Sequence, residues 1–343
     1  MSHARLLVAA CLAFLSRQSA PVAPHPVPAD TLTDEQTSGR TQLGLPESIP
    51  GVDDSALGQA RAKLGRKLFF DPILSADRTV ACASCHEPQL AFATHDVKPP
   101  GVGGHACARN APTLFNRALG TAQFFDGRAA SLEEQALQPI ANPDEMGGDV
   151  DAIVARLAAD PDYRALFAAA GTAAPDRTTL ALSLAQFVRR LVVADSPIDR
   201  FRAAQGTLTA TERRGLWIFE SKGHCWQCHA GPNFSDESFH DTGIGVKDGH
   251  PEPGRFAITH DEDDRGRFKT PTLRMVARTA PYMHDGSLAT LADVVAFYKR
   301  GGNPNDHLDP RIVPLDLADD DVAALVALLE ALSRAAEPAR DER

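Results

Sequence analysis

The sequence predicts a mainly α-helical protein built from two related units, and three observations support this fold class. A chain of 343 residues has the length of about two domains. The string Cys-x-x-Cys-His occurs at 82–86 and again at 225–229, and a similar apolar segment precedes each copy, GRKLF at 65–69 and GLWIF at 215–219. Strand patterns are few, whereas apolar residues at helical spacing recur along the chain.

The N-terminal part of the chain, up to residue 50, precedes these units. A positively charged flank is followed by an apolar run from Leu6 to Leu15, which is too short to span a bilayer and is typical of a signal peptide. We expect residues 1–20 to be a signal peptide and 21–50, rich in Pro, Ser, Thr and Asp, to be a linker. Cys11 then leaves with the signal; the alternative is a lipid anchor on Cys11. No later stretch is long enough to span a membrane.

Helical patterns follow in order. Residues 177–193 carry periodic apolar side chains and end the first unit or bridge to the second, and we place the division near 195–208. Thr209 and Glu212 have the spacing of a capping box and predict the start of a helix in the second unit. A last helix is expected at about 319–335, with its apolar residues on one face.

Composition excludes some classes of function. The 45 acidic residues outnumber the 35 Lys and Arg residues, which gives a formal net charge of −10. Nucleic-acid-binding proteins usually present a basic surface, so this balance argues against nucleic acid as a partner. It suits a basic protein partner. Hydrophobic residues make up 43% of the chain, which is enough to build ordinary cores.

The two Cys-x-x-Cys-His strings predict covalent haem attachment. Two thiols at this spacing form thioether bonds with the vinyl groups of haem, and the adjacent histidine binds the iron. A redox dithiol would need a thioredoxin-like βαβ context, and a four-cysteine zinc site would leave both histidines unexplained. We therefore expect no disulfide and one free thiol, Cys107. The predicted haem-binding residues are Cys82, Cys85, His86, Cys225, Cys228 and His229.

The segments around these strings resemble the bacterial dihaem cytochrome c peroxidase family, which includes the MauG enzymes. The resemblance implies two cytochrome c-like domains with one c-type haem each, a peroxide-reacting N-terminal domain at 51–200 and an electron-transfer C-terminal domain at 201–336. The matching strings are LGRKLFFDPILSADRTVACASCHEPQLAF, RNAPTLFN, FFDGRAASLEEQALQPIANPDEM, LTATERRGLWIFESKGHCWQCHAGPNFSD and FKTPTLRMVARTAPYMHDGSLATLADVVAFYKRGG.

The resemblance also implies how the first haem works. His86 is its proximal ligand, and a glutamate followed by methionine supplies the acid–base group for peroxide cleavage, which maps onto Glu145. Gln135 maps onto a pocket glutamine. In classical members a loop histidine can block the open face of this haem. The corresponding position here is near Val102, which favours a haem that is ready without reductive activation.

Two nearby histidines, His105 and His95, are alternatives for that blocking role. The other interpretation of His105 is a loop histidine that faces solvent.

The second haem takes His229 as its proximal ligand. In the family the other axial position follows the histidine of the PY-x-H segment at a fixed distance, and counting from His284 places it at Tyr298. Classical peroxidases have methionine at this place, whereas MauG-like members have tyrosine. The remaining chemical candidates are Met275, Met283 and His284. Tyr298 shares a helix face with Leu291, Val294 and Val295, and Gly301-Gly302 end this helix.

One position departs from the MauG pattern. The family usually has tryptophan before Asp-Gly-Arg as an electron relay between the haems, and here this residue is Phe125. Phenylalanine is much harder to oxidise, which puts charge sharing between the haems in question. Trp217 and Trp226 are near the second haem-binding string and are interpreted as packing residues, with charge relay as the alternative.

A calcium ion between the domains is also implied by the family. Its protein ligands map onto the side chain of Asn110 and the backbone carbonyls of Thr279 and Pro281. Such hard oxygen donors suit calcium. These three residues have no sequence signal of their own, so this prediction rests on the resemblance.

Taken together, these patterns predict a periplasmic dihaem peroxidase that reduces hydrogen peroxide with electrons from a small cytochrome c or cupredoxin. One alternative is a MauG-like oxidase that uses peroxide-derived high-valent iron to modify a partner protein. Another is a dihaem electron carrier without catalysis, which Glu145 and Gln135 argue against. Classical relatives are often dimers, and the resemblance therefore also suggests a homodimer.

Overall fold

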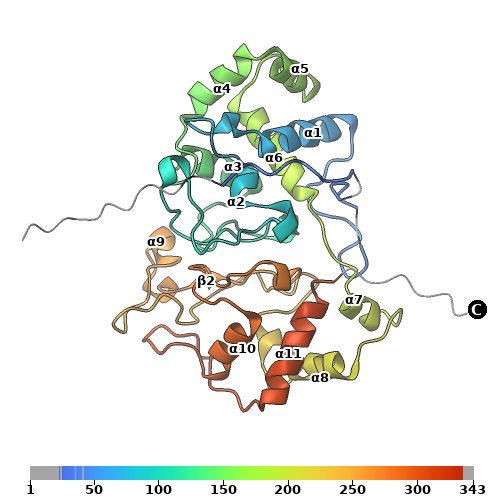
Figure 1. Ribbon diagram of the computed structural model, residues 1–343, viewed down its shortest axis with the longest axis vertical. Helices are drawn as coiled ribbons and strands as arrows, with labels where there is room; N and C mark the ends of the chain where they lie inside the picture. The colour runs from blue at the N-terminus through green and yellow to red at the C-terminus, as the bar shows by residue number, and fades with distance from the viewer. Residues whose placement is uncertain (1–22, 24, 35, 41, 335–343) are drawn as a thin grey trace, which may run out of the picture.

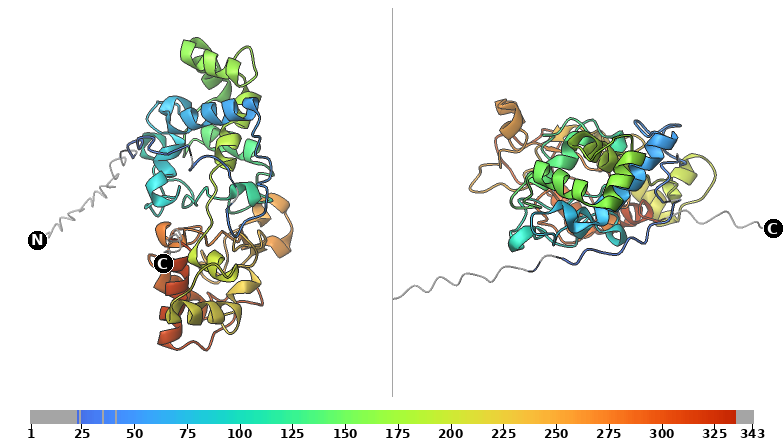
Figure 2. Two further views of the ribbon diagram at one scale, coloured as in Figure 1. Left: turned by 90° about the vertical axis from the view of Figure 1, so that its right-hand side faces the viewer. Right: turned by 90° about the horizontal axis from the view of Figure 1, so that it is seen from above.

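The computed structural model describes residues 23, 25–34, 36–40 and 42–334. It forms two groups of helices stacked along the long axis of the molecule, and both views agree on this arrangement (Figures 1 and 2). The predicted mainly helical class is confirmed. The first group holds α1 (Ala56–Phe70), α2 (Cys82–Cys85), α3 (Leu132–Ala141), α4 (Val150–Ala159), α5 (Pro161–Ala169) and α6 (Arg177–Arg189). The second holds α7 (Pro197–Arg202), α8 (Ala210–Glu220), α9 (Phe256–Thr259), α10 (Leu291–Lys299) and α11 (Asp319–Ala331).

Two short strands and several isolated β-bridges are the extended structure among the described residues. β1 (Phe239–His240) pairs antiparallel with β2 (Phe268–Lys269), with Phe239 opposite Lys269. Several single 3₁₀ turns connect the helices, including η5 (Cys225–Gln227) in the second haem-binding string.

The predicted capping box at the start of α8 is present. Thr209 Oγ1 accepts a hydrogen bond from the Glu212 N–H at 3.2 Å, and the Thr209 N–H donates to Glu212 Oε2 at 2.8 Å. These two bonds satisfy backbone groups that the first turn of a helix leaves without partners. The helix predicted at 177–193 ends earlier, at Arg189, and the helix predicted at 319–335 ends at Ala331.

The two similar apolar segments form equivalent helix crossings. Gly65 on α1 meets α6, and a Cβ atom on it would lie 1.9 Å from the Ser183 carbonyl oxygen. Gly215 on α8 meets α11, and a Cβ atom there would lie 2.1 Å from the Ala324 carbonyl oxygen. Only glycine permits such close contact between helix backbones. The recurrence of glycine in GRKLF and GLWIF therefore reflects one packing motif used twice.

Each group of helices has its own hydrophobic core. Leu64, Leu68, Leu180 and Leu184 are fully or almost fully buried where α1 and α6 pack. Ile218, Leu325 and Leu328 occupy the corresponding position between α8 and α11, in a cluster that belongs to the second group of helices. Burial of these apolar side chains supplies the main drive for folding each group.

A second internal repeat lies after the haem-binding strings. Its first copy, 110–132, follows the first string, its second copy, 269–291, follows the second string, and the two copies align without gaps. Left-handed backbone recurs at equivalent positions: Asn116 and Met275 have φ of 58° and 61°, and Phe124 and Met283 have φ of 67° and 75°. Each repeat then leads into a helix that a hydroxyl side chain caps, Ser131 before α3 and Thr290 before α10. The two predicted units therefore resemble each other in backbone conformation as well as in sequence.

Residues 25–34 and 36–40 of the N-terminal segment form no helix or strand, but side chains of the first group of helices hold this part of the chain. Arg66 of α1 binds Asp30 through two hydrogen bonds, and Arg190, which follows α6, donates to the Ser38 carbonyl oxygen at 2.9 Å. The predicted signal peptide, 1–20, and Cys11 lie outside the described residues. Among the described residues, no helix has the length and apolar character that crossing a membrane requires.

Candidate active site

The first haem-binding string lies on α2 and the residue that ends it. Cys82 and Cys85 are the first and last residues of this single turn, and His86 is its C-cap. His86 Nδ1 donates a hydrogen bond to the Phe92 carbonyl oxygen at 3.0 Å, which leaves Nε2 for iron. Burial lowers the pKa of His86 and favours the neutral imidazole that a metal requires.

The second string repeats this arrangement. Cys225 is the first residue of η5 and Cys228 is its C-cap, and His229 Nδ1 donates to the Phe234 carbonyl oxygen at 2.9 Å. Phe92 and Phe234, the two acceptors, both have left-handed backbone, with φ of 58° and 50°. Burial again lowers the pKa of the histidine. Two thiols beside an imidazole whose Nδ1 is fixed make a donor set that fits haem c at both places.

Glu145 faces the first haem-binding string. Its negative charge acts on the thiols of Cys82 and Cys85 and adds to the effect of burial, which raises the pKa of Cys82 to about 12. Asn142 Nδ2 donates to Glu145 Oε1 at 2.7 Å. Burial raises the pKa of Glu145, opposed by the Asn142 hydrogen bond and the charge of Arg128. The carboxyl group is thus partly desolvated and held in place, as an acid–base group should be.

Gln135 lies on α3, whose C-terminal end leads into the turn that carries Asn142 and Glu145. Its side chain forms no hydrogen bond within the described part of the chain. The amide is therefore available to a ligand. Gln135 forms no hydrogen bond with Glu145, and α3 brings the two residues close only through Asn142, its C-cap, which binds Glu145.

The loop at 99–107 lies against the backbone of Glu145. The Val102 N–H donates to the Glu145 carbonyl oxygen at 2.8 Å, and Val102 packs on the core of the first group. His105 is exposed, and its ring lies beside Gly103. His95 is bound to Glu87 and more than half exposed. None of the contacts formed by these histidines in the described chain involves Glu145.

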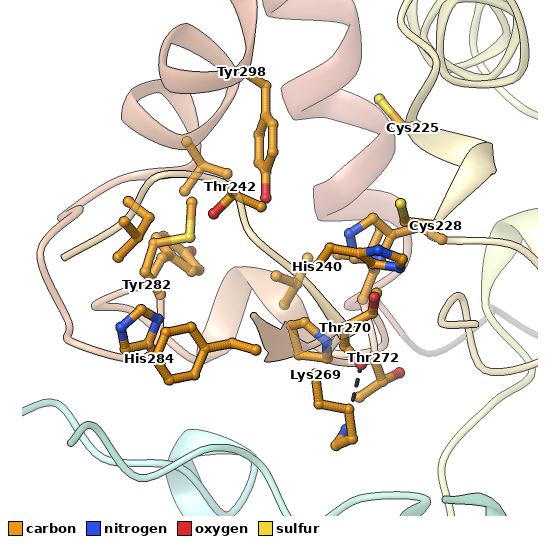
Figure 3. Close-up of a pocket in the computed structure, with 18 of the residues that line it drawn as sticks. Cys225, Cys228, His240, Thr242, Lys269, Thr270, Thr272, Tyr282, His284 and Tyr298 are labelled. Carbon is orange, nitrogen blue, oxygen red and sulfur yellow. Dashed lines mark hydrogen bonds between the residues drawn. The ribbon is translucent and has the colours of Figure 1, made fainter. Parts of the chain in front are cut away.

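A cavity beside the second string collects most of the other predicted residues (Figure 3). Tyr298 projects into it from α10, opposite Cys225 and Cys228. The Tyr298 hydroxyl forms no hydrogen bond among the described residues, and burial raises its pKa far above the usual range. Met283 and His284 also line the cavity, but Met275 is not among the residues that line it. Met275 has left-handed backbone, and its N–H donates a hydrogen bond to the Leu332 carbonyl oxygen.

Phe125, which stands where the family usually has a relay tryptophan, is part of an aromatic cluster between the two groups of helices. Phe268 and His284 are stacked, with ring centroids 3.6 Å apart, and Phe125 meets His284 edge to face at 6.3 Å. All three rings line the cavity of the second string. Sequence reasoning considered His284 only as an iron ligand, because a stacking partner on a separate segment, here β2, has no sequence signal.

The interpretation of Trp217 and Trp226 as packing residues is wrong. Trp217 is 60% exposed and Trp226 is 47% exposed, which makes them the two most prominent aromatic side chains on the surface of the second group. Neither ring forms an aromatic contact with a described residue.

The three predicted calcium ligands lie along the same cavity. Asn110, Thr279 and Pro281 all line it. Asn110 Nδ2 donates to the Asp96 carbonyl oxygen at 2.8 Å, which fixes the amide and leaves Oδ1 as an acceptor. The carbonyl oxygens of Thr279 and Pro281 accept no hydrogen bond within the described part of the chain. This set of oxygen donors without partners fits a hard cation such as calcium.

Two features were absent from the sequence-based predictions. Cys107 is a free, buried thiol, as a small core residue would be, but its position within hydrogen-bonding reach of Cys85 was not predicted. Glu237 binds both Arg117, at 3.1 Å, and Lys269, at 3.2 Å, at the junction of the two groups. Neither contact has a local motif, because the partners are far apart in the sequence.

Comparison with known proteins places these features in a family. A family model described as di-haem cytochrome c peroxidase matches residues 59–207. The methylamine utilization protein MauG of Methylorubrum extorquens is 38% identical over 91% of this chain and 88% of that protein. The cytochrome c551 peroxidase of Pseudomonas aeruginosa is 34% identical over 89% of this chain and 87% of that protein.

A solved structure is also similar. The crystal structure of a MauG-like protein associated with microbial copper homeostasis aligns with a TM-score of 0.77 and 32% identity, covering 85% of this chain and 95% of that chain. The chain therefore belongs to the di-haem cytochrome c peroxidase family and is an oxidoreductase of the cytochrome c peroxidase and MauG-like kind.

Proposed function

We propose that this protein is a peroxide-dependent oxidoreductase in which the 51–200 unit holds the haem that reacts with hydrogen peroxide and the 201–336 unit holds the haem that delivers electrons to it. One observation carries this division of roles. When the gapless alignment of 110–132 with 269–291 is continued into the helices that follow, Pro139 on α3 stands where Tyr298 stands on α10. A phenol can bind iron, whereas a proline ring cannot, so α3 offers no ligand at this position to the first haem.

The protein groups around the first haem suit peroxide cleavage. When bound, this haem would supply the iron that takes up peroxide and stores the oxidising equivalents. Glu145 would accept the proton from the oxygen nearer the iron and return it to the leaving oxygen, which departs as water. Its raised pKa brings the protonated and ionised forms closer to balance near neutral pH. Gln135 would donate a hydrogen bond to the bound peroxide from α3.

The second site suits electron delivery. His229 and Tyr298, which line the same cavity, would hold the iron of its haem, and a phenolate ligand would stabilise oxidised iron. Phe125, His284 and Phe268 would provide the packed path between the two sites. These rings pack against one another at the place where the family usually has a tryptophan before Asp-Gly-Arg.

Three further assignments belong to this proposal. Calcium would be bound by Asn110 Oδ1 and the carbonyl oxygens of Thr279 and Pro281. The signal peptide expected at 1–20 would direct the chain to the periplasm, the compartment where c-type haem is attached. The electron donor would be a small cytochrome c or cupredoxin, and the net charge of −10 favours one with a basic surface.

A second candidate function is oxidation of a partner protein, as in a MauG-like enzyme. Tyr298 favours it, because a tyrosine at this position is what MauG-like members carry. The exposed rings of Trp217 and Trp226, on the second group of helices, would offer such a partner an apolar contact surface.

Steady-state turnover of peroxide with a reduced small cytochrome, without prior reduction of the enzyme, separates these functions. Rapid turnover supports the peroxidase, whereas poor turnover with long-lived oxidised haem supports oxidation of a partner protein. A pyridine haemochrome assay should give two c-type haems per chain, and a smaller number would contradict the proposal.

Replacement of Tyr298 by phenylalanine tests the second site. Tyr298→Phe should change the low-spin spectrum of the second haem, because the oxygen ligand is lost. Tyr282→Phe is the matched control, since Tyr282 lines the same cavity. Equal spectra for the two variants would remove Tyr298 as a ligand.

A further inference from the structure

Four side chains that the proposed function does not use converge next to the first haem-binding string. They are His25 of the N-terminal segment, Glu87, His95 and Asp96. His25 is far from the other three in the sequence, so the N-terminal segment folds back along the first group of helices to reach them. One ligand atom from each of His25, His95 and Asp96 lies within 4.8 Å of the others.

The geometry within this cluster is that of groups facing a common point. His25 Nε2 contacts Asp96 Oδ2, and His95 Nε2 lies 3.9 Å from Asp96 Oδ1. The two imidazole rings meet edge to face, with centroids 4.8 Å apart. Two nitrogen atoms therefore approach the two oxygen atoms of one carboxylate.

Glu87 has a different role in the cluster. Its Oε1 accepts a hydrogen bond from His95 Nδ1 at 2.9 Å. This bond fixes the tautomer of His95, so that Nε2, the atom near Asp96, carries the lone pair. A carboxylate behind a histidine in this manner is the usual outer partner of a metal-binding imidazole, and it also makes the ligand more basic.

We propose that His25, His95 and Asp96 form a site for a divalent transition metal ion that prefers imidazole ligands, with Zn²⁺ as the ion to test. Two neutral imidazoles and one carboxylate are a common zinc donor set, and water or another small ligand completes a four-coordinate ion. Calcium is disfavoured, because two of the three protein ligands are nitrogen atoms.

Burial supports a site in which water can complete the coordination. The side chains of His25 and Asp96 are 29% and 28% exposed, and that of His95 is 53% exposed. An ion could therefore enter from solvent without rearrangement of the fold. The Glu87 carboxylate is 23% exposed, which gives its bond to His95 partial protection from water.

The site would fasten the N-terminal segment to the molecule beside the proposed calcium site. The Asp96 carbonyl oxygen accepts the hydrogen bond from Asn110 Nδ2 that orients the asparagine. The loop after Asp96 meets the second group of helices, where a Cβ atom on Gly286 would lie 2.7 Å from the Val97 carbonyl oxygen. An ion bound to Asp96 would thus tie residues 25–34 to the junction of the two groups.

Zinc binding to the exported, haem-loaded enzyme tests the proposal. The N-terminus is first determined by mass spectrometry, and any affinity tag is removed. After treatment with a chelator and return of calcium, Zn²⁺ is titrated calorimetrically, and metal content is measured after dialysis. We expect one Zn²⁺ per wild-type chain and loss of this ion in both His25→Ala and His95→Ala.

Two further variants sharpen the result. Glu87→Gln should keep the stoichiometry but weaken zinc binding by about 10- to 100-fold, the usual effect of losing an outer carboxylate. His250→Ala is the control, because His250 is exposed and outside the cluster, and it should bind zinc as the wild type does. Haem content and visible spectra confirm that each variant is folded.

Three outcomes would overturn the inference. These are a mature chain that begins after His25, wild-type enzyme that binds no zinc, and zinc binding that survives in both His25→Ala and His95→Ala. In the second case the cluster would be an ion pair that only fastens the segment.

Discussion

Replacement of Glu145 by glutamine is the sharpest test of the proposed chemistry, because the structure separates the proton-transfer role of this residue from its structural role. Glu145 Oε1 accepts one side-chain hydrogen bond, from Asn142 Nδ2 at 2.7 Å. A glutamine carbonyl oxygen can accept the same bond, and the two side chains have nearly the same volume. The variant should therefore fold and bind haem normally while losing the ability to take and return a proton.

The expected loss can be stated as a rate. A positioned acid–base group contributes about 10²- to 10⁴-fold to a proton-transfer step. At about 1.36 kcal/mol for each factor of ten, Glu145→Gln should raise the barrier by about 2.7 to 5.4 kcal/mol. The rate is measured by stopped-flow absorbance of the haem, with peroxide in excess.

The pH dependence gives a second signature. Glu145 must be ionised to accept the proton, so the rate falls as pH decreases through its pKa. Because burial raises this pKa above the ordinary value for glutamate, the wild-type rate should begin to fall at a higher pH than an exposed glutamate would produce. This acid limb should be absent in Glu145→Gln.

Asp144→Asn is the matched control, because it removes a neighbouring exposed carboxylate and should leave the maximal rate near the wild type. Its acid limb should remain but move to lower pH, because the charge of Asp144 contributes to the raised pKa of Glu145. A Glu145→Gln rate within about threefold of the wild type, or an unchanged acid limb, would refute the acid–base role; threefold is well below the smallest effect expected of such a group.

Three predictions concern stability. Asp199→Ala should lower the free energy of unfolding by about 3–5 kcal/mol in urea titrations, because the buried Arg274 loses its carboxylate partner at 2.7 Å, whereas Asp195→Ala, at a more exposed pair, should cost about 1 kcal/mol or less. Burial lowers the pKa of Lys269 from 10.5 to about 8, so between pH 8 and pH 10.5 the unfolded chain binds more protons than the folded chain. The free energy of unfolding should therefore rise with pH across this interval, and the urea midpoint of Lys269→Met should rise less than that of the wild type. Gly65→Ala should destabilise the α1–α6 crossing by about 1–3 kcal/mol or more, and wild-type thermal stability would contradict the close backbone contact.

The features that could be predicted from the sequence are those that chemistry confines to a few neighbouring residues. Haem attachment requires two cysteines and a histidine within one short string, so its residues are visible in the sequence. The capping box of α8 is similar, since Thr209 and Glu212 satisfy backbone groups of the same helical turn. The repeated glycine was also visible, although only the structure reveals that it marks a crossing of two helices.

The features that could not be predicted depend on partners far apart in the chain or on unusual backbone. Phe92 and Phe234 present their carbonyl oxygens to the two histidines through left-handed backbone, a conformation that is uncommon for aromatic residues. The aromatic cluster around His284 requires Phe125 and Phe268 to meet across the two groups. Exposure of Trp217 was missed because apolar character predicts burial only on average.

The internal repeat also gives a physical reason why the proposed calcium site would have no counterpart at the equivalent place in the other repeat. Ala122 and Pro281 are equivalent in the two repeats. In the first repeat, Arg117 Nη2 donates to the Ala122 carbonyl oxygen at 3.0 Å. The residue equivalent to Arg117 in the second repeat is Val276, which has no group to offer the Pro281 carbonyl oxygen.

The position of Asn110 also differs in charge between the two repeats. Asn110 is equivalent to Lys269, whose ammonium group is bound to Glu237 at 3.2 Å, next to Arg117. At one of the two equivalent places, carbonyl oxygens of the first repeat therefore lie near the side-chain cations Arg117 and Lys269. At the other, carbonyl oxygens of the second repeat lie with the asparagine amide of the first and without such cations. A bound metal cation, as proposed for calcium, would supply there the positive charge that Arg117 and Lys269 supply at the equivalent place.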